Sequence, residues 1–182
     1  MPSFVLTGTP GSGKTAILRH LEVDGFSVIE EAATDVIALN HARGHDEPWS
    51  DPGFIDAIVD LQRRRQLAAT RTPGPVVFDR SPICTYALAL FLGHPSSPSL
   101  TAELDRIRDE AVYDRRVFFV TGQGFITPTA ARRITLADAL RFEALHAKVY
   151  RSLGYDLVLV GPGPLDARAA RVRALLRQTS ET

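Results

Sequence analysis

The strongest constraint on this chain is a glycine-rich stretch near its N-terminus. It fits the pattern G-x-x-x-x-G-K-[ST] at every fixed position, and its residues are Gly8, Thr9, Pro10, Gly11, Ser12, Gly13, Lys14 and Thr15. A short apolar run, residues 4–6, precedes the stretch, and a segment of helical composition that begins at Ala16 follows it. Strand, glycine loop and helix are therefore in the order that a phosphate-binding loop requires.

The chemistry of phosphate binding explains why the loop has these residue types. Glycine adopts backbone dihedrals that are closed to other residues, so loop N–H groups can converge on a triphosphate, and the helix that starts near Ala16 adds its positive dipole end. Lys14 then reaches the β- and γ-phosphates, and the Thr15 hydroxyl is placed to ligate Mg²⁺. We therefore predict that residues 8–16 bind ATP together with Mg²⁺.

The composition supports a specific role for the lysine of this loop. The chain contains nineteen arginines but two lysines, Lys14 and Lys148. The alternative is a glycine-rich turn that happens to precede Lys-Thr, and we would then expect arginine at this position. A planar guanidinium does not replace the compact ammonium that the phosphate site needs.

Length and charge bound the remaining possibilities. The chain has 182 residues, with 45% hydrophobic and 23% charged content, so we expect one domain over residues 1–178 and a polar tail at 179–182. Lys+Arg and Asp+Glu are both 21, so bulk charge favours neither nucleic acid nor a membrane surface as a partner. Without an apolar run of membrane-spanning length or a leader pattern, we expect a cytoplasmic protein, monomer or homodimer, with a small-molecule partner.

Strand and helix signals alternate along the chain. The predicted strands are residues 4–6, 26–29, 76–79, 116–121 and 155–160, and the predicted helices are residues 16–21, 32–42, 51–69, 81–92, 101–113, 135–154 and 165–176. This pattern predicts a three-layer α/β fold, a P-loop NTPase fold of kinase type, with a parallel five-stranded sheet and helices on both faces. We expect the second and third strands on one side of the first, and the fourth and fifth on the other.

The helix predicted over residues 135–154 has two local signals. Thr135 and Asp138 form a capping-box start. Its apolar face is predicted to consist of Leu136, Leu140, Leu145, Val149 and Leu153.

Carboxylates follow two of the predicted strands. Glu30 and Glu31 end the second strand, at the edge of a parallel sheet where ligands bind. Position alone leaves an alternative open, in which the pair merely supplies favourable negative charge at a helix N-terminus. Asp79 ends the third strand in the form of a Walker B element, which predicts a place near the Mg²⁺ held by Thr15. Its alternative role is a helix N-cap.

A polar run lies along the helix predicted over residues 51–69. Three consecutive arginines, residues 63–65, are typical of a solvated helix face. Gln62 and Gln66 share one side of the helix through their i,i+4 spacing, so they could hydrogen-bond a base or an amide.

Taken together, these motifs resemble a known family. The phosphate loop, Glu31-Ala32-Ala33, Gln62, Asp79-Arg80 and the pair Arg132-Arg133 are similar to those of small bacterial P-loop ATP-binding proteins of the AAA type, a family that includes the ribosylnicotinamide kinase domain. More distantly, Asp79-Arg80-Ser81 is similar to a stretch of the deoxynucleoside and thymidylate kinases.

The resemblance implies roles that the residues alone do not establish. Arg80 would hold phosphate or substrate, and Glu31, with Glu30 as its substitute, would activate the hydroxyl of the acceptor. A lid would span residues 122–134 and carry Arg132 and Arg133 toward the phosphates. The turn at residues 161–164 would border the adenine.

Two functions follow from these expectations. The first is a Mg²⁺-dependent kinase that moves the γ-phosphoryl of ATP to a nucleoside-like or nucleotide-like acceptor. The second is an ATPase that acts as a nucleotide-dependent regulatory switch without such an acceptor. The sequence has no Asn-Lys-x-Asp motif for guanine, and Asp79 is followed by arginine rather than by the glutamate that would polarise water in a motor ATPase. We therefore expect the kinase.

Overall fold

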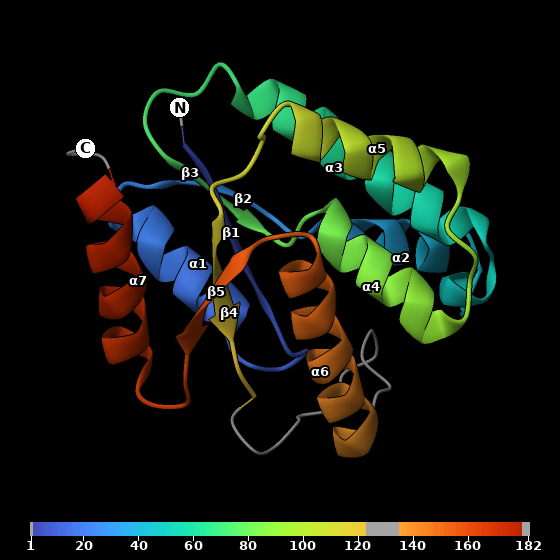
Figure 1. Cartoon of the computed structure of the whole chain (residues 1–182). Coiled ribbons are helices and arrows are strands. Elements are labelled where there is room, and N and C mark those ends of the chain that lie inside the picture. Colours follow the sequence, from blue (N-terminus) through green and yellow to red (C-terminus); the bar gives the residue numbers. More distant parts are fainter. Residues whose placement is uncertain (1, 123–134, 180–182) are drawn as a thin grey trace.

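The protein folds around a parallel sheet of five strands. The computed structural model describes residues 2–122 and 135–179. The strands are β1 (Ser3–Gly8), β2 (Ser27–Ile29), β3 (Val76–Asp79), β4 (Arg116–Val120) and β5 (Asp156–Val160), in the spatial order β2-β3-β1-β4-β5. The helices are α1 (Lys14–Val23), α2 (Ala32–Ala42), a 3₁₀ turn η1 (Pro48–Ser50), α3 (Gly53–Ala69), α4 (Pro82–Leu92), α5 (Pro98–Asp109), α6 (Leu136–Ser152) and α7 (Leu165–Thr179) (Figure 1). The predicted strand order is confirmed.

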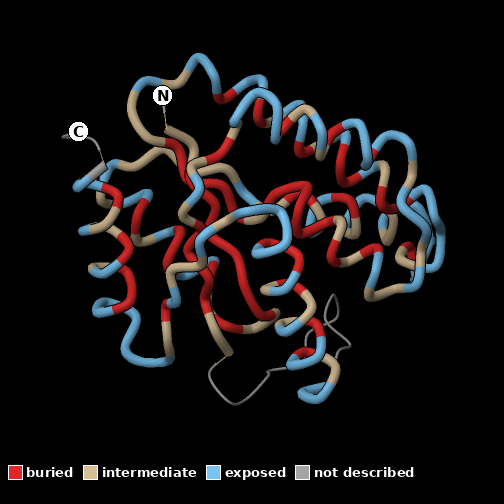
Figure 2. The backbone as a smooth tube through the Cα atoms, in the orientation of Figure 1, coloured by how far each residue is buried: buried red, intermediate tan, exposed pale blue. Residues whose placement is uncertain are grey.

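The central strand β1 is buried on both of its faces. Phe4 and Leu6 pack on one side with side chains of α1 and α7, and Val5 packs on the other with α4 and α6. All three residues are 0% exposed. Figure 1 shows α1 and α7 together on one face of the sheet, and Figure 2 shows that burial concentrates in the strands and in the helix faces turned toward them. The predicted three-layer fold is therefore confirmed.

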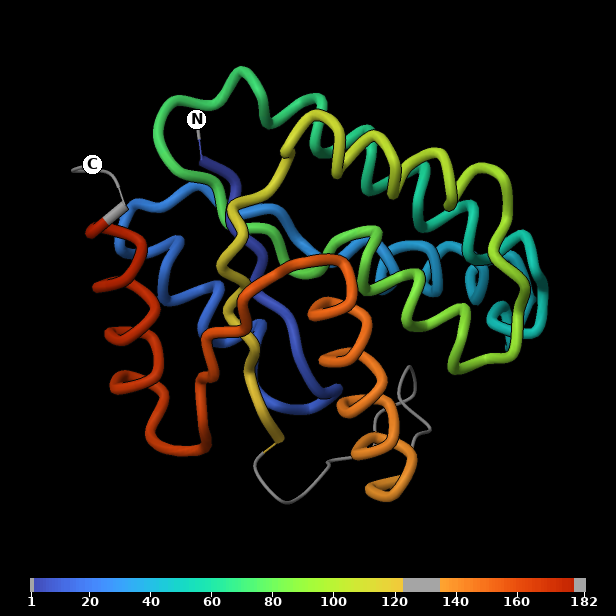
Figure 3. The backbone as a smooth tube through the Cα atoms, in the orientation of Figure 1, coloured from blue at the N-terminus to red at the C-terminus, as the bar shows by residue number. Residues whose placement is uncertain are grey.

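Helices α2, α3 and α5 form a second core against α4. Ile55 and Ile58 of α3 pack with Val36 of α2 and Leu100 of α5, and Ala89 of α4 belongs to the same cluster. Figure 3 shows these helices grouped on the side of the molecule away from α7. Helix α3 thereby borders the ends of β2 and β3, where it lines a small cavity.

Strand register brings the predicted polar residues to one edge of the sheet. Leu6 of β1 is the register partner of Asp79, and Phe78 is the partner of Ile29 in β2. Since all the pairings are parallel, the chain leaves β1, β2 and β3 in the same direction. The phosphate loop, the Glu30-Glu31 pair and Asp79-Arg80 therefore emerge side by side.

Several helices begin one to three residues from the predicted position, and two of them, α3 and α5, show the reason in their capping bonds. Helix α5 begins at Pro98 rather than at residue 101, because Ser97 is its N-cap and its hydroxyl accepts a 3.1 Å hydrogen bond from the Leu100 N–H. It also ends earlier, at Asp109. Helix α3 begins at Gly53, and Asp51 acts just outside it, with Oδ1 accepting a 2.8 Å bond from the Gly53 N–H.

The apolar face predicted for α6 is wrong at three of its five positions, whereas Val149 is buried and Leu145 packs against the core as predicted. Leu136, Leu140 and Leu153 are 46%, 53% and 42% exposed. The buried positions are Ala139, Phe142, His146, Val149 and Tyr150. The face shifts because an aromatic row packs against α4 and the sheet, and this row buries more surface than the leucines would. The capping role of Thr135 is confirmed, since its hydroxyl accepts a 3.1 Å bond from the Asp138 N–H.

Within residues 2–122 and 135–179, the structure has no helix with the length and apolar content that a membrane span requires.

Candidate functional site

The glycine-rich loop joins β1 to α1 and depends on its glycines. Gly8, Gly11 and Gly13 have φ values of 131°, 82° and 85°, a region that side chains disfavour. At Gly8 the reason is also steric, because a Cβ atom would lie 2.0 Å from the carbonyl oxygen of Val120 in β4. The loop therefore runs against the end of β4, and Thr9 N–H donates a 3.2 Å bond to that same carbonyl.

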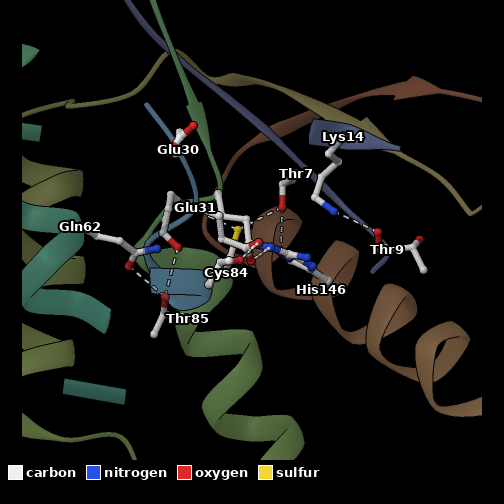
Figure 4. A network of polar contacts seen from close by, with 12 residues as sticks. Thr7, Thr9, Lys14, Glu30, Glu31, Gln62, Cys84, Thr85 and His146 are labelled. Carbon is white, nitrogen blue, oxygen red and sulfur yellow. Dashed lines mark hydrogen bonds and ion pairs between the residues drawn. The ribbon is translucent and has the colours of Figure 1, made fainter. Parts of the chain in front are cut away.

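Lys14 is the first residue of α1 and lies folded over the loop. It is 6% exposed, and its Nζ donates a 3.0 Å hydrogen bond to the carbonyl of Thr9 (Figure 4). Thr15 and Ala16 follow in the first turn and are exposed. The N-terminal end of α1 and a lysine ammonium thus meet at the loop, an arrangement suited to binding phosphate.

Glu31 faces Arg80, whereas Glu30 does not. Glu31 Oε1 lies 2.5 Å from Arg80 Nε, and Thr34 Oγ1 donates a 3.1 Å bond to Glu31 Oε2. The Glu30 carboxylate instead forms an ion pair with Arg19 of α1, and Figure 4 shows it well apart from Glu31. Of the two acidic residues that follow β2, Glu31 therefore belongs to the cluster at the strand ends.

The alternative role for Glu31 was a negative charge at a helix N-terminus. Its backbone has that position, but its side chain does not cap the helix. Glu31 is the N-cap residue of α2, yet within the described part of the chain it makes no side-chain capping bond to that helix. Burial disfavours its ionised form, but the charges of Arg80 and Lys14 and the hydrogen bonds from Thr34 and Arg80 outweigh this effect. The pKa of Glu31 is therefore lowered, and its side chain is a carboxylate at neutral pH.

Arg80 is held in an unusual backbone conformation. Its φ is +71°, which is rare for a residue other than glycine, and its N–H donates a 3.0 Å bond to the carbonyl of Leu6. Burial disfavours its charge, but Glu31 and other neighbouring groups more than compensate and raise the pKa of Arg80. The guanidinium is thus a fixed cation that the turn after β3 directs toward Glu31.

Asp79 is the last residue of β3 and is 5% exposed. The N-cap alternative is wrong, because Ser81 is the N-cap residue of α4. Burial raises the pKa of Asp79 to about 6; the charge of Lys14 opposes this rise and that of Glu31 adds to it. Among the described residues, nothing hydrogen-bonds to its Oδ1. A buried carboxylate oxygen in this condition is suited to a cation.

These residues fit the predicted Mg²⁺ when phosphate oxygens complete the shell. In the described ranges, no group of three His, Cys, Asp or Glu side chains could hold a metal ion. Mg²⁺ is commonly bound by one or two protein oxygens, waters and substrate phosphates, rather than by an all-protein cage. Asp79, with the hydroxyl of Thr15, is a donor set of that kind.

A small cavity lies beside the acidic residues, between the sheet and α3. It is lined by Ile29, Glu30, Gln62, Arg65, Phe78, Asp79, Arg80 and Tyr113. Gln62 is 8% exposed, and its Oε1 accepts a 2.8 Å bond from Thr85 Oγ1 (Figure 4). Gln66 has another role, because its Nε2 donates a 2.5 Å bond to the Tyr113 hydroxyl. The two glutamines share one side of α3, as predicted, but only Gln62 lines the cavity.

A buried polar network beneath the loop was not predicted. Thr7 of β1 contacts His146 of α6 and Cys84 of α4 (Figure 4), and Tyr150 of α6 extends the network from Cys84 to Ser81, the N-cap residue of α4. Thr7 Oγ1 lies 3.1 Å from His146 Nε2, and the Tyr150 hydroxyl lies 2.7 Å from Ser81 Oγ. The spacing of Phe142, His146 and Tyr150 at i, i+4 and i+8 was the available signal, but the exposed leucines of α6 masked it.

Arg132 and Arg133, and most of the lid predicted over residues 122–134, lie outside the described residues. The turn predicted to border the adenine, residues 161–164, follows β5 and leads into α7.

The comparisons with known proteins agree with this architecture. A structure of deoxyadenosine kinase from M. mycoides with the products dCMP and a flexible dCDP has a TM-score of 0.61 at 15% identity, covering 97% of this chain and 99% of that chain. Structures of the same kinase with dCTP and with dATP give TM-scores of 0.64 and 0.53, at 10% and 11% identity, and cover 98% and 96% of this chain and 100% and 99% of those chains. At these identities the likeness shows the fold.

No curated protein gave a match to the sequence. A family model described as the AAA domain matches residues 3–168, which is most of the chain. The phosphate loop and all five strands, including β3 with Asp79, lie within the matched range. The chain therefore belongs to this AAA domain family of P-loop proteins.

Proposed function

We propose that this protein is an ATP-binding kinase that transfers the γ-phosphoryl group to a nucleoside-like or nucleotide-like small molecule and depends on Mg²⁺. The observation that carries the proposal is the ion pair between Arg80 and Glu31, 2.5 Å long, at the strand ends beside Asp79 and the phosphate loop. A charged pair next to a triphosphate site supplies what an acceptor needs, a cation for its phosphate and a carboxylate for its hydroxyl.

The donor side of the reaction belongs to the loop. Lys14 would leave the Thr9 carbonyl and bind the β- and γ-phosphates, where its charge offsets the charge that develops during transfer. Thr15 and Asp79 would hold Mg²⁺, which supplies charge neutralisation and fixes the phosphate chain when bound. The buried Oδ1 of Asp79, to which nothing hydrogen-bonds among the described residues, supports this assignment, because a cation there would favour the carboxylate that burial opposes.

The acceptor side belongs to the residues that follow β2 and β3. Glu31 is ionised at neutral pH because its pKa is lowered, so it can accept a hydrogen bond from an acceptor hydroxyl and orient that oxygen toward the γ-phosphate. Phosphoryl transfer needs positioning more than it needs a strong base, so a carboxylate of low pKa is adequate. Arg80 keeps this carboxylate in place and can contact the acceptor.

Gln62 and the comparisons support a nucleoside-like acceptor. The amide of Gln62 lines the cavity next to Arg80, and Thr85 fixes its Oε1. The similar structures include those of a deoxyadenosine kinase with dCMP and dCDP, with dCTP or with dATP. At 10–15% identity we take from them the class of ligand and not its identity.

The proposal also includes the lid arginines, the extent of the domain, the cellular location and the partner. Arg132 and Arg133 would approach the phosphates from a lid at residues 122–134, and one domain would span residues 1–178. We propose a cytoplasmic protein whose partner is a small molecule rather than nucleic acid or a membrane.

A ligand screen followed by a transfer assay tests the proposed function. Nucleosides and nucleotides are added to the protein with Mg²⁺ and a non-hydrolysable ATP analogue, and the melting temperature is measured, because a ligand of the native state raises it. Candidates that raise it are then incubated with ATP, and their phosphorylated products are measured. An acceptor-dependent product that Lys14→Ala cannot form is the expected result. Hydrolysis of ATP at a rate that no acceptor changes would instead favour the regulatory switch.

A further inference from the structure

Thr9 of the phosphate loop is held through its carbonyl and its hydroxyl as well as through its N–H. Its carbonyl accepts hydrogen bonds from Lys14 Nζ at 3.0 Å and from the Ser12 N–H at 3.2 Å. Its hydroxyl donates to the carboxylate of Glu143, which lies on α6. Because Thr9 is 2% exposed, water does not readily replace these partners.

Glu143 connects this loop to another part of the chain. Its Oε2 also accepts a 3.1 Å hydrogen bond from the N–H of Gly122, two residues beyond the end of β4. The same carboxylate oxygen therefore joins the phosphate loop, the residue that follows β4 and helix α6. Gly122 and α6 are the described parts of the chain on either side of residues 123–134.

The sign of this charge is unexpected beside a phosphate site. A carboxylate repels a triphosphate, so a residue there that served only to attract the ligand would be neutral or basic. A hydrogen bond to a charged acceptor is stronger than one between neutral groups, however, and fixes the donor more firmly. Glu143 is therefore suited to hold the loop rather than to contact the ligand.

We propose that Glu143 is a positioning residue of the nucleotide site, acting through the hydroxyl of Thr9. The inference rests on the proposed function. The carbonyl that supports Lys14 belongs to the residue that Glu143 holds, and Thr9 N–H is bonded to Val120 of β4. A displaced Thr9 would displace the neighbouring loop N–H groups that are expected to bind the phosphates, together with the position from which the Lys14 ammonium moves onto them, so the nucleotide would find its binding groups out of place.

A double-mutant cycle on nucleotide affinity tests this proposal. The probe is a fluorescent ATP analogue with Mg²⁺, titrated into the wild type, Glu143→Ala, Thr9→Val and the double variant. We expect each single change to weaken affinity about tenfold, within the range of one hydrogen bond to a charged group. The double variant should be about as weak as either single variant. Thr9→Ser, which keeps the hydroxyl, should bind better than Thr9→Val.

A matched variant controls for the loss of a negative charge. Glu110→Ala removes a carboxylate that is 59% exposed at the end of α5, and it should bind the analogue like the wild type. Glu143→Gln keeps the size and an acceptor oxygen, so it should lose less affinity than Glu143→Ala and serves in the cycle if the alanine variant does not fold. Melting temperatures without nucleotide show whether each variant is folded.

The outcomes separate this inference from the proposed function. Wild-type affinity in both Glu143→Ala and Thr9→Val, or a loss of about a hundredfold in the double variant, would overturn the positioning role. If Lys14→Ala loses affinity in the same assay, the phosphate-loop assignment stands regardless of that result. If the wild type does not bind the analogue, or Lys14→Ala binds it equally well, both proposals fail.

Discussion

Asp79 lies beside Leu6 in the parallel pairing of β3 with β1. Leu6 is two residues before Gly8, where the phosphate loop begins. This register brings a carboxylate that is 5% exposed to the root of a loop that carries a lysine. Burial and the charges around it set the pKa of Asp79, and Lys14 is the cation with the largest effect. The two residues therefore belong to one electrostatic unit, and changing either should affect the other.

Lys14→Ala should abolish phosphoryl transfer and leave the fold intact. The lost ammonium removes charge stabilisation at the phosphates. The variant also loses the hydrogen bond to the Thr9 carbonyl, so the free energy of unfolding should fall by about 1 kcal/mol. Turnover is measured alongside urea unfolding. Turnover within a few-fold of the wild type would contradict the phosphate-loop assignment.

Acid should destabilise the fold through His146. Burial, with the charges of Arg80 and Lys14, lowers the pKa of His146 well below 6.5, so the imidazole is neutral in the folded protein. The unfolded chain binds a proton near pH 6.5 that the folded chain does not. Stability from this residue is therefore fully present above pH 6.5 and falls below it, by up to about 1.4 kcal/mol per pH unit.

Chemical unfolding of the wild type and His146→Gln between pH 5 and pH 8 measures this effect. The variant should be less stable at pH 8, because it disturbs the contact with Thr7 and the ring stacking with Tyr150. It should nevertheless lose less stability than the wild type on acidification. If the free energy of unfolding changes equally with pH in the two proteins, another group is responsible for the loss of stability in acid.

The sequence predicted the parts of the site that depend on local chemistry. A glycine loop, a strand that ends in Asp79 and a helix over residues 32–42 follow from dihedral freedom, apolar runs and breakers, and β3 and α2 have the predicted bounds. These features need no knowledge of distant contacts. The strand order came from the P-loop kinase arrangement that the glycine loop indicates, because alternating strands and helices predict a parallel sheet but not the order of its strands.

The rest of the site depends on contacts between distant residues. Glu143 meets Thr9 across 134 positions of sequence, and His146 meets Thr7 across 139. Periodicity placed Leu136, Leu140 and Leu153 on the buried face of α6, but these leucines are exposed and Phe142, His146 and Tyr150 are buried instead. Likewise, the sequence could not decide between Glu30 and Glu31, since the choice depends on where Arg80 points after its left-handed turn.

Asp79→Asn should weaken every Mg²⁺-dependent step, including the slow background hydrolysis of ATP. The change removes negative charge from the expected metal shell. Because burial opposes the carboxylate, the same variant should melt at a temperature equal to or above that of the wild type at pH 8 without nucleotide. Activity is measured over a range of Mg²⁺ concentrations, with melting curves in parallel. Unchanged Mg²⁺ dependence would remove Asp79 from the metal site.

Glu31→Gln should reduce transfer to the acceptor and leave ATP hydrolysis nearly unchanged. The carboxylate pairs with Arg80 beside the cavity, on the side that we propose for the acceptor, whereas Asp79 ends β3, the strand that pairs with β1 and its loop. If Glu31 orients the acceptor hydroxyl or accepts its proton, transfer should fall by about 10²- to 10⁴-fold. The assay measures transfer and hydrolysis side by side, with an acceptor from the ligand screen.

The neighbouring Glu30→Gln is the matched control for this prediction. Glu30 borders the cavity, but its carboxylate is 51% exposed and pairs with Arg19, so the variant should transfer phosphate like the wild type. A residue that acted only at the N-terminus of α2 would cost about 0.3–1 kcal/mol of stability when neutralised and leave both activities alone. Equal losses of transfer and hydrolysis in Glu31→Gln would place Glu31 with the metal and the phosphates instead. Loss of neither activity would make it a structural residue and favour the ATPase switch over the kinase.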